Sequence, residues 1–243
     1  MLGAFFGVLL KGHPVFPITL FDYNGVLADD EHVHLEAFRD TVRPLGIEIS
    51  EADYLERYLG FDDKGAFEAL LREAGRPAGP SDVAVLVEAK RPHYMQRARA
   101  GLKTFAGAGE ALRRRSEHGP VLVVSGALRE EIEFGLQQLG VRERVLHIVS
   151  AEDTKRSKPD PEGYQLAKEF LRARGVPSVE RALVIEDSLD GISAAKAAGL
   201  PCVAVAQSYS RERLLETGAD LVVGQVADVD DETLAKLYAS LYG

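Results

Sequence analysis

Five short apolar segments stand out along the chain, each rich in Val, Ile and Leu and without alternating polar positions. Strands that are buried on both faces have this pattern. Between and after these segments, apolar residues recur three or four positions apart among charged residues, which is typical of amphipathic helices. The predicted strands are residues 18–21, 121–124, 145–149, 182–185 and 202–205, and the predicted helices are residues 108–117, 129–139, 162–174 and 192–198. The alternation predicts an α/β fold with a doubly wound parallel sheet.

A long stretch after the first predicted strand breaks this alternation. From residue 31 to 102 there is no convincing strand, only helix-like runs at residues 35–45, 51–59, 64–74 and 83–100, with a turn indicated by Pro77, Gly79 and Pro80. A chain of 243 residues can form one core of about 150 residues and a smaller unit. We therefore expect a core domain made of residues 1–30 and 103–243 and an inserted, all-helical cap domain made of residues 31–102.

The charge balance narrows the class of partner. The chain has 38 acidic and 29 basic residues, a formal net charge of −9, so its long-range field repels nucleic acid and anionic membrane surfaces. We expect neither as a partner, and a phosphorylated ligand would need a local basic site. Apolar residues make up 46% of the chain and charged residues 28%, which is typical of a folded globular protein.

The start of the chain, Met1 to Leu10, is apolar like the centre of a signal peptide. It has no basic region before it and no small-residue cleavage site after it, because Lys11 follows directly. It is also shorter than the roughly 20 residues that span a bilayer. We expect an N-terminal extension and a cytoplasmic protein. The single cysteine, Cys202, lies in a predicted strand, which favours a buried structural thiol.

The residues that follow the predicted strands are the candidates for chemistry, because ligands of open parallel sheets bind beyond the carboxyl ends of the strands. These residues are Asp22, Ser125, Glu186 and Asp187, and Lys158 lies in a proline-rich loop. A carboxylate can attack phosphorus, a hydroxyl and an ammonium can hold phosphate oxygens, and adjacent carboxylates suit magnesium. Taken singly, Asp22 and Ser125 could cap a turn or helix, and Lys158 could be a surface lysine.

Four motifs in chain order favour the chemical interpretation. Phe21-Asp-Tyr-Asn-Gly-Val-Leu, Val124-Ser-Gly, Ser157-Lys-Pro-Asp-Pro-Glu and Val184-Ile-Glu-Asp-Ser-Leu-Asp-Gly-Ile resemble the motifs of the haloacid dehalogenase superfamily. The resemblance spans residues 18–207, and the helical insertion is similar to the cap of the subgroup that contains phosphoglycolate phosphatase and beta-phosphoglucomutase. It implies a Rossmann-like core, a cap that closes over the site and selects the leaving group, and Mg²⁺ as the cofactor.

The resemblance also implies a role for each motif residue. Asp22 matches the catalytic nucleophile and a magnesium ligand, and Asn24 would supply a second ligand through its backbone carbonyl. Asp187 matches the metal ligand of the fourth motif, with Glu186 beside it as a ligand or as a supporting group.

The phosphoryl group would be held by the second and third motifs. Ser125, with the backbone amide of Gly126, matches the phosphate-binding hydroxyl. Lys158 matches the lysine that neutralises the nucleophile and the phosphoryl group, and so counts as both a catalytic and a substrate-binding residue.

Asn24 departs from the family pattern. Family phosphatases and phosphomutases have an aspartate two residues after the nucleophile, which acts as general acid and then as general base. An amide cannot shuttle a proton near neutral pH, and general acid–base catalysis is worth about 10²- to 10⁴-fold. We expect a phosphatase-type hydrolase that acts on a small phosphorylated metabolite through an aspartyl phosphate on Asp22 and is impaired by Asn24.

Several alternatives remain open at the sequence level. The chain could be a non-catalytic phosphate-ester binding protein, or less readily a phosphomutase. A dehalogenase conflicts with the retained Asp187, and a phosphonatase would need Lys64 or Lys90 of the cap to reach the site. One of the residues that follow the first motif could stand in for the missing acid, namely Asp29, Asp30, Glu31, His32 or His34. We expect these residues instead to cap a helix and link the domains.

Overall fold

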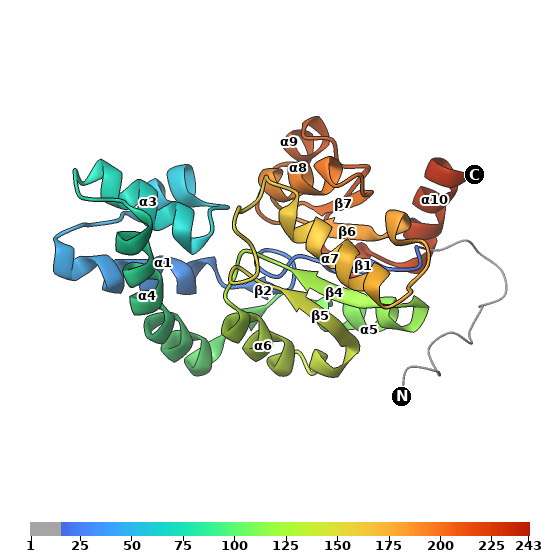
Figure 1. The fold of residues 1–243 in the computed structure, drawn as a ribbon. Coiled ribbons are helices and arrows are strands. Elements are labelled where there is room, and N and C mark those ends of the chain that lie inside the picture. The colour runs from blue at the N-terminus through green and yellow to red at the C-terminus, as the bar shows by residue number, and fades with distance from the viewer. Residues whose placement is uncertain (1–15) are drawn as a thin grey trace.

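The computed structural model describes residues 16–243, so the apolar segment Met1 to Leu10 lies outside the described residues. A six-stranded parallel sheet with the strand order β5-β4-β1-β6-β7-β8 forms the core (Figure 1). The strands are β1 (Thr19–Phe21), β4 (Val121–Val124), β5 (Val145–Val149), β6 (Leu183–Glu186), β7 (Cys202–Val205) and β8 (Leu221–Val223). The predicted α/β class and parallel sheet are confirmed, and β8 adds a strand that the sequence pattern did not predict.

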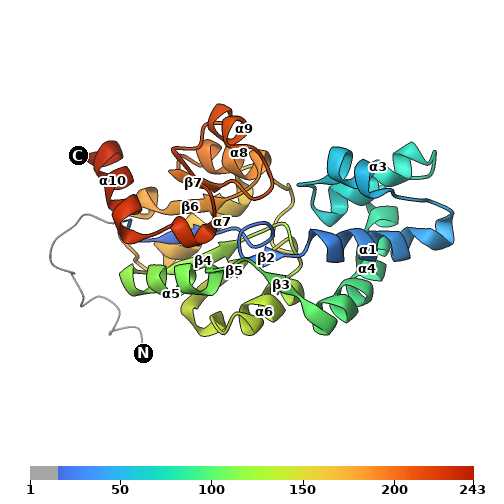
Figure 2. The ribbon, with the colours of Figure 1, turned by 180° about the vertical axis from the view of Figure 1, so that it is seen from behind.

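Successive side chains of the strands enter two different apolar layers, as the pleat of a sheet requires. Phe21 and Ile185 belong to a buried cluster that also contains residues of α5 (Ala108–His118), α6 (Arg129–Gln138) and α10 (Asp231–Tyr242). Leu20 and Cys202 belong to the other cluster, with residues of α7 (Glu162–Ala173), α8 (Leu189–Ala197) and α9 (Arg211–Glu216). Figures 1 and 2 show the helices on the two faces. Cys202 is fully buried, as predicted.

The position of β1 determines where a ligand can bind. β1 pairs with β4 on one side and with β6 on the other. The chain fills the β4 and β5 side first and then crosses to β6, β7 and β8. This reversal leaves a crevice beyond the carboxyl ends of the central strands, and it brings Asp22, Ser125 and Glu186 to the same edge of the sheet.

The inserted helices leave and rejoin the core at adjacent points. β2 (Ala28–Asp29) and β3 (Lys103–Thr104) pair in antiparallel fashion on either side of the insertion. Between them lie α1 (Glu31–Val42), α2 (Glu51–Asp53) with a π-helical turn (Tyr54–Tyr58), α3 (Asp63–Glu73) and α4 (Pro80–Gly101). These helices stand at one end of the sheet (Figure 1). We refer to them as the cap, and the domain boundaries given above stay a prediction.

The cap has its own apolar cluster. Phe38 of α1 packs edge-on against Phe67 of α3, with ring centroids 4.9 Å apart, and Val87 of α4 joins the same cluster. The expected absence of strands between residues 31 and 102 is confirmed. Within residues 16–243, no helix has both the length and the apolar composition needed to cross a membrane.

Candidate active site

The turn after β1 brings the first motif against the fourth. Asp22 follows β1, and its backbone N–H donates a hydrogen bond to the carbonyl of Ile185 at 2.9 Å. Gly25 has a φ of +72°, a left-handed conformation that favours glycine. A Cβ added at Gly25 would lie 1.9 Å from Oδ2 of Asp187. The turn therefore needs glycine both for its backbone conformation and for the close approach of Asp187.

Lys158 lies at the centre of the site. Its ammonium donates hydrogen bonds to Oδ1 of Asp22 at 2.7 Å, to Oε1 of Glu186 at 2.5 Å and to the carbonyl of Val124 at 3.1 Å. Burial alone would lower the pKa of Lys158, but the charges of Asp22 and Glu186 and the hydrogen bonds to them raise it above its ordinary value. The alternative of a surface lysine is wrong, because three oxygen atoms surround this ammonium.

Glu186 ends β6 and is fully buried. Besides Lys158, its Oε1 accepts a hydrogen bond from the hydroxyl of Tyr164 at 3.0 Å. Its Oε2 accepts hydrogen bonds from the backbone N–H groups of Asp187 at 3.0 Å and Ser188 at 3.1 Å. Both oxygens are thus occupied by protein donors, which suits a group that orients Lys158.

Three buried carboxylates lie together here, and the ammonium of Lys158 contacts two of them, Asp22 and Glu186. One oxygen from each of Asp22, Glu186 and Asp187 lies within 4.8 Å of the others. Burial raises the pKa of Asp22 to about 6, with Lys158 opposing and Glu186 adding to the effect. Burial and the charges of Glu186 and Asp22 raise the pKa of Asp187 well above its ordinary value. The cluster has more negative charge than Lys158 can compensate, and its oxygen ligands fit a hard divalent cation.

Ser125 and Gly126 lie beside this cluster. The hydroxyl of Ser125 donates a hydrogen bond to Oδ1 of Asn24 at 3.2 Å and accepts one from the backbone N–H of Ala127 at 3.3 Å. Helix α6 begins only at Arg129, so Ser125 is not its N-cap. Ser125 and Gly126 both line the cavity that contains Asp22.

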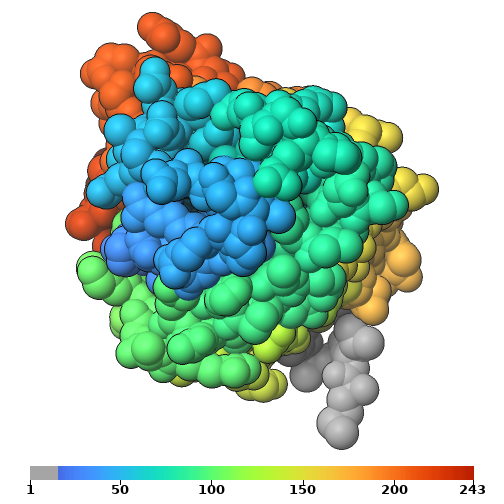
Figure 3. Space-filling model, turned by 90° about the vertical axis from the view of Figure 1, so that its left-hand side faces the viewer, coloured from blue at the N-terminus to red at the C-terminus, as the bar shows by residue number. Residues whose placement is uncertain are grey.

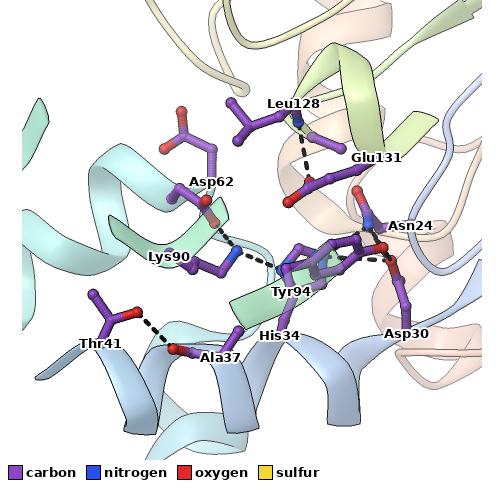
Figure 4. A network of polar contacts seen from close by, with 12 residues as sticks. Asn24, Asp30, His34, Ala37, Thr41, Asp62, Lys90, Tyr94, Leu128 and Glu131 are labelled. Atoms are coloured by element: carbon purple, nitrogen blue, oxygen red, sulfur yellow. Dashed lines mark hydrogen bonds and ion pairs between the residues drawn. The ribbon is translucent and has the colours of Figure 1, made fainter. Parts of the chain in front are cut away.

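Asn24 connects the core to the cap. Its Nδ2 donates to the two carboxylate oxygens of Asp30 at 3.1 and 3.0 Å and lies 3.1 Å from Nε2 of His34 (Figure 4). With Ser125 bound to Oδ1, both ends of the amide have partners. Asp30 occupies the N-cap position of α1 but makes no side-chain capping bond, so the expectation that it caps a helix is wrong for this residue.

A network of polar side chains continues from Asp30 into the cap. The hydroxyl of Tyr94 donates to Asp30 at 2.5 Å, and Nδ1 of His34 lies 2.7 Å from Nζ of Lys90. Lys90 is fully buried and forms an ion pair with Asp63. Burial and Lys90 would lower the pKa of His34, but the carboxylate of Asp30 raises it above its ordinary value. The motifs gave no indication of Tyr94, Lys90 or Asp63 at this position.

The candidate groups surround a small cavity of about 90 Å³ between core and cap. The cap covers this end of the molecule (Figure 3). Two contacts join it to the core beside the cavity: Lys64 donates to the carbonyl of Ala151 at 3.0 Å, and the hydroxyl of Ser157 donates to the carboxylate of Asp62. Neither Lys64 nor Lys90 lines the cavity, so neither is placed as a phosphonatase lysine.

The family model for haloacid dehalogenase-like hydrolases matches residues 19–205. This range covers most of the chain and contains every residue of the cluster described above. The chain belongs to the haloacid dehalogenase-like hydrolase family. Its parallel sheet with an inserted helical cap is the fold found in structures of other members of the family.

Two similar proteins with assigned activities are phosphatases. Validoxylamine A 7'-phosphate phosphatase from Streptomyces hygroscopicus subsp. limoneus is 31% identical over 216 residues, covering 88% of this chain and 96% of the relative. A phosphorylated carbohydrates phosphatase from Thermotoga maritima is 29% identical over 209 residues, covering 84% of this chain and 93% of the relative. As a haloacid dehalogenase-like hydrolase with such relatives, this chain is an enzyme of the phosphatase type.

The solved structures similar to this chain include CbbY from Rhodobacter sphaeroides. The complex of CbbY with phosphate has a TM-score of 0.77 and 26% sequence identity, and the match covers 91% of this chain and 99% of CbbY. A CbbY variant with asparagine in place of one aspartate, in complex with xylulose-(1,5)bisphosphate, has a TM-score of 0.75 and 28% identity, with 88% and 96% coverage. These matches extend over both the sheet and the cap.

Proposed function

We propose that this haloacid dehalogenase-like hydrolase is a magnesium-dependent phosphatase that transfers the phosphoryl group of a small phosphorylated metabolite to Asp22 and then to water. The observation that carries the proposal is the position of Asp22, whose carboxylate is held by Lys158 at 2.7 Å in the cavity between core and cap. Asp187 of the same carboxylate cluster and Ser125 line that cavity as well.

The donor set fits a magnesium ion. Asp22 and Asp187 would hold the ion through carboxylate oxygens and Asn24 through its backbone carbonyl. Glu186, whose oxygens already accept bonds from Lys158 and backbone N–H groups, would support this set more readily than ligate directly. When bound, the ion would offset the excess negative charge and screen the phosphoryl oxygens from Asp22.

The proposed reaction has two displacements. In the first, an oxygen of Asp22 bonds to phosphorus while the bond from phosphorus to the leaving oxygen breaks, and that oxygen takes up a proton. In the second, water bonds to phosphorus, loses a proton, and the bond to Asp22 breaks to release inorganic phosphate. Lys158, the hydroxyl of Ser125 and the amide of Gly126 would hold the phosphoryl oxygens in both steps.

Asn24 would slow both proton transfers. Its amide is bound between Ser125 and Asp30 and cannot give or take a proton near neutral pH. We propose that substrates with poor leaving groups, such as alkyl phosphates, suffer most. Aryl phosphates need little protonation of the leaving oxygen and should be cleaved more readily in the first step.

The named activities of the relatives support a sugar-like substrate. One relative is named for validoxylamine A 7'-phosphate and another for phosphorylated carbohydrates. The cavity of about 90 Å³ is smaller than the roughly 300–1,000 Å³ of typical ligand pockets, so a sugar phosphate would need the cap to open further than in the position described here. We therefore propose a phosphorylated sugar or a similar polyhydroxylated molecule as the substrate class.

The test compares hydrolysis of an aryl phosphate and an alkyl phosphate with and without Mg²⁺. Asn24→Asp alone would set two carboxylates together, because Asn24 donates to Asp30 at 3.0 Å. The sharper variant is therefore Asn24→Asp combined with Asp30→Asn, which moves the carboxylate to position 24 and keeps the net charge. We expect this pair to hydrolyse the alkyl phosphate about 10²-fold faster than the natural chain.

Each result of this comparison decides one part of the proposal. Turnover without metal would overturn the magnesium-dependent mechanism, and turnover by Asp22→Asn would remove Asp22 as nucleophile. Equal alkyl phosphate rates for the natural chain and the exchanged pair would show that Asn24 does not impair the enzyme. If both were inert while binding Mg²⁺ and phosphate, the chain would be a phosphate-ester binding protein.

A further inference from the structure

The cap side of the active-site cavity is acidic. Three cap carboxylates line it, those of Glu31, Asp62 and Asp63, together with the ring of His34. Among the described residues that line the cavity, the single lysine is Lys158 on the core side, and there is no arginine. The part of the cavity that faces the leaving group therefore differs in charge from the part that faces the phosphoryl group.

We refer to the cap side of the cavity, formed by Glu31, Asp62 and Asp63, as the acidic wall. The cations nearest to this wall already have carboxylate partners. Lys90 is paired with Asp63, and His34 lies 3.4 Å from Oδ2 of Asp30. Glu31 accepts a hydrogen bond from the hydroxyl of Tyr54 at 2.7 Å, and no basic side chain within residues 16–243 forms an ion pair with it. The negative charge of Glu31 is thus available to a ligand.

Two carboxylate oxygens of the wall lack protein donors. Tyr54 binds Oε2 of Glu31, and no donor from residues 16–243 is bound to Oε1. Asp63 is 9% exposed, and its buried Oδ2 has no hydrogen-bond partner within the described part of the chain, although Oδ1 is paired with Lys90. Oδ2 of Asp63 is shielded from solvent. The acceptor that the wall offers to a ligand N–H is therefore Oε1 of Glu31, which lines the cavity.

The chemistry of this wall selects between leaving groups. A second phosphate in this cavity would face the like charge of Glu31, and no lysine or arginine other than Lys158 lines the cavity to receive it. An ammonium would face the opposite charge of Glu31 and would donate to its open Oε1. We propose, on the basis of the phosphatase function proposed above, that the preferred substrate is a monophosphate of a polyhydroxylated molecule with a cationic amine in its leaving group, bound by Glu31.

The test uses sugar phosphates that differ in one substituent. Glucosamine 6-phosphate has a cationic amine, N-acetylglucosamine 6-phosphate has the amine acetylated, and glucose 6-phosphate has a hydroxyl at the same carbon. We expect kcat/KM for glucosamine 6-phosphate to exceed that for each of the other two by about tenfold, which corresponds to about 1.4 kcal/mol. Fructose 1,6-bisphosphate should be the poorest substrate, in contrast to the bisphosphate complex of CbbY.

A matched pair of variants assigns the preference to the wall. Glu31→Gln keeps the size of the side chain and an acceptor for Tyr54 but removes the charge, and it should reduce the preference for the amine to about onefold. Glu48→Gln makes the same change at an exposed position of the cap and should keep the preference. A preference that survives Glu31→Gln in a variant with an unchanged melting temperature, or a bisphosphate that is hydrolysed as well as the amine, would overturn the inference.

A binding measurement separates this inference from the proposed function. If the chain hydrolyses no aryl phosphate with Mg²⁺, the phosphatase proposal fails, but the acidic wall can still be tested. Calorimetric titration of Asp22→Asn with the same sugar phosphates in Mg²⁺ should give glucosamine 6-phosphate the tightest binding by about tenfold. Equal affinities for the amine, its acetylated form and the hydroxyl would refute the inference whether or not the enzyme turns over.

Discussion

Glu131 of α6 is a buried acid beside the polar network of the cap. Its Oε2 accepts a hydrogen bond from the backbone N–H of Leu128 at 3.1 Å, and its Oε1 has no partner within residues 16–243. Burial raises its pKa from 4.5 to about 7, with Asp63 adding to the rise and Lys90 opposing it. The folded protein therefore keeps a proton on Glu131 between about pH 4.5 and 7 that the unfolded chain releases. Stability falls as the pH rises through this window.

The variant Glu131→Gln removes this ionisation. We compare the free energy of unfolding of Glu131→Gln with that of the natural chain. We expect the difference, variant minus natural chain, to increase between pH 5 and pH 8 by up to about 3 kcal/mol for a pKa shift of this size. Urea unfolding at the two pH values measures the difference. The control is Glu130→Gln, the same change at the exposed neighbouring position, for which the difference should stay constant. An equal effect of both variants would contradict the assigned cause.

The residues predicted from the motifs and the residues that were missed differ in how they reach the site. Asp22, Ser125 and Asp187 follow strand ends, so the parallel sheet alone brings them together. Lys90 reaches His34 across 56 positions of the sequence, and only the packing of α1 against α4 determines that contact. Among the contacts around Asn24, the sequence indicated only the pairing of Asp30 with His34, because residues four positions apart on a helix are neighbours. A carboxylate at the start of a helix is, however, equally typical of an N-cap residue.

At the scale of an element, α8 is tied to the active site through Gly191. A Cβ added at Gly191 would lie 1.9 Å from Oε1 of Glu186, the same oxygen that accepts the hydrogen bond from Lys158. A side chain there would have to displace either the helix or the carboxylate. Position 191 of α8 therefore has to lack a side chain for Glu186 to orient Lys158.

Gly191→Ala should lower the free energy of unfolding by about 1–3 kcal/mol, as overpacking usually does, and should lower kcat on an aryl phosphate at least tenfold. Chemical denaturation and steady-state kinetics measure the two effects. Gly101→Ala at the end of α4 is the matched control, since an added Cβ there meets nothing within 4 Å. If Gly191→Ala proved as harmless as Gly101→Ala, α8 would not determine the position of Glu186.

The elements that the sequence pattern missed are short or lie beyond the last motif. β8 has three residues (Leu221–Val223), and its apolar run is shorter than the four- and five-residue runs from which the other strands were predicted. The start of helix α10 could have been predicted from Asp230, because aspartate is a preferred N-cap residue. In the structure its side chain accepts a hydrogen bond from the backbone N–H of Thr233 at 2.7 Å and caps the helix. The strands β2 and β3 have two residues each. They are recognised as strands only because they pair with each other across the insertion.

At the scale of the whole molecule, contacts between cap and core decide access to the cavity. Lys64 of α3 donates hydrogen bonds to the carbonyls of Ala151 at 3.0 Å and Thr154 at 3.4 Å in the core loop after β5. Tyr209 donates to the carbonyl of Leu59 at 3.4 Å on another side of the cavity. These contacts stabilise the cap in the position that covers Asp22.

Lys64→Met keeps most of the apolar stem and removes the charged donor. Because a hydrogen bond from a charged group contributes about 1.5–3 kcal/mol, we expect the covered state to be less populated and KM for the phosphate ester to rise about tenfold, with little change in the melting temperature. Kinetics with an aryl phosphate measure the effect. Lys236→Met on α10, far from the cavity, should leave KM unchanged, and an equal KM for both variants would refute the role of Lys64.

The pairing of Ala28 with Thr104 and of Asp29 with Lys103 has an evolutionary consequence. The two ends of the helical insertion are neighbours, so the whole segment could be exchanged for another of any length without altering the register of the parallel sheet. A new leaving-group preference could then arise by replacing one contiguous stretch of the gene, while most of the catalytic carboxylates and the lysine stay where the core holds them. Asn24 is a partial exception, because its partner Asp30 stays with the core while His34 belongs to α1. An exchanged cap would have to supply another group in place of His34.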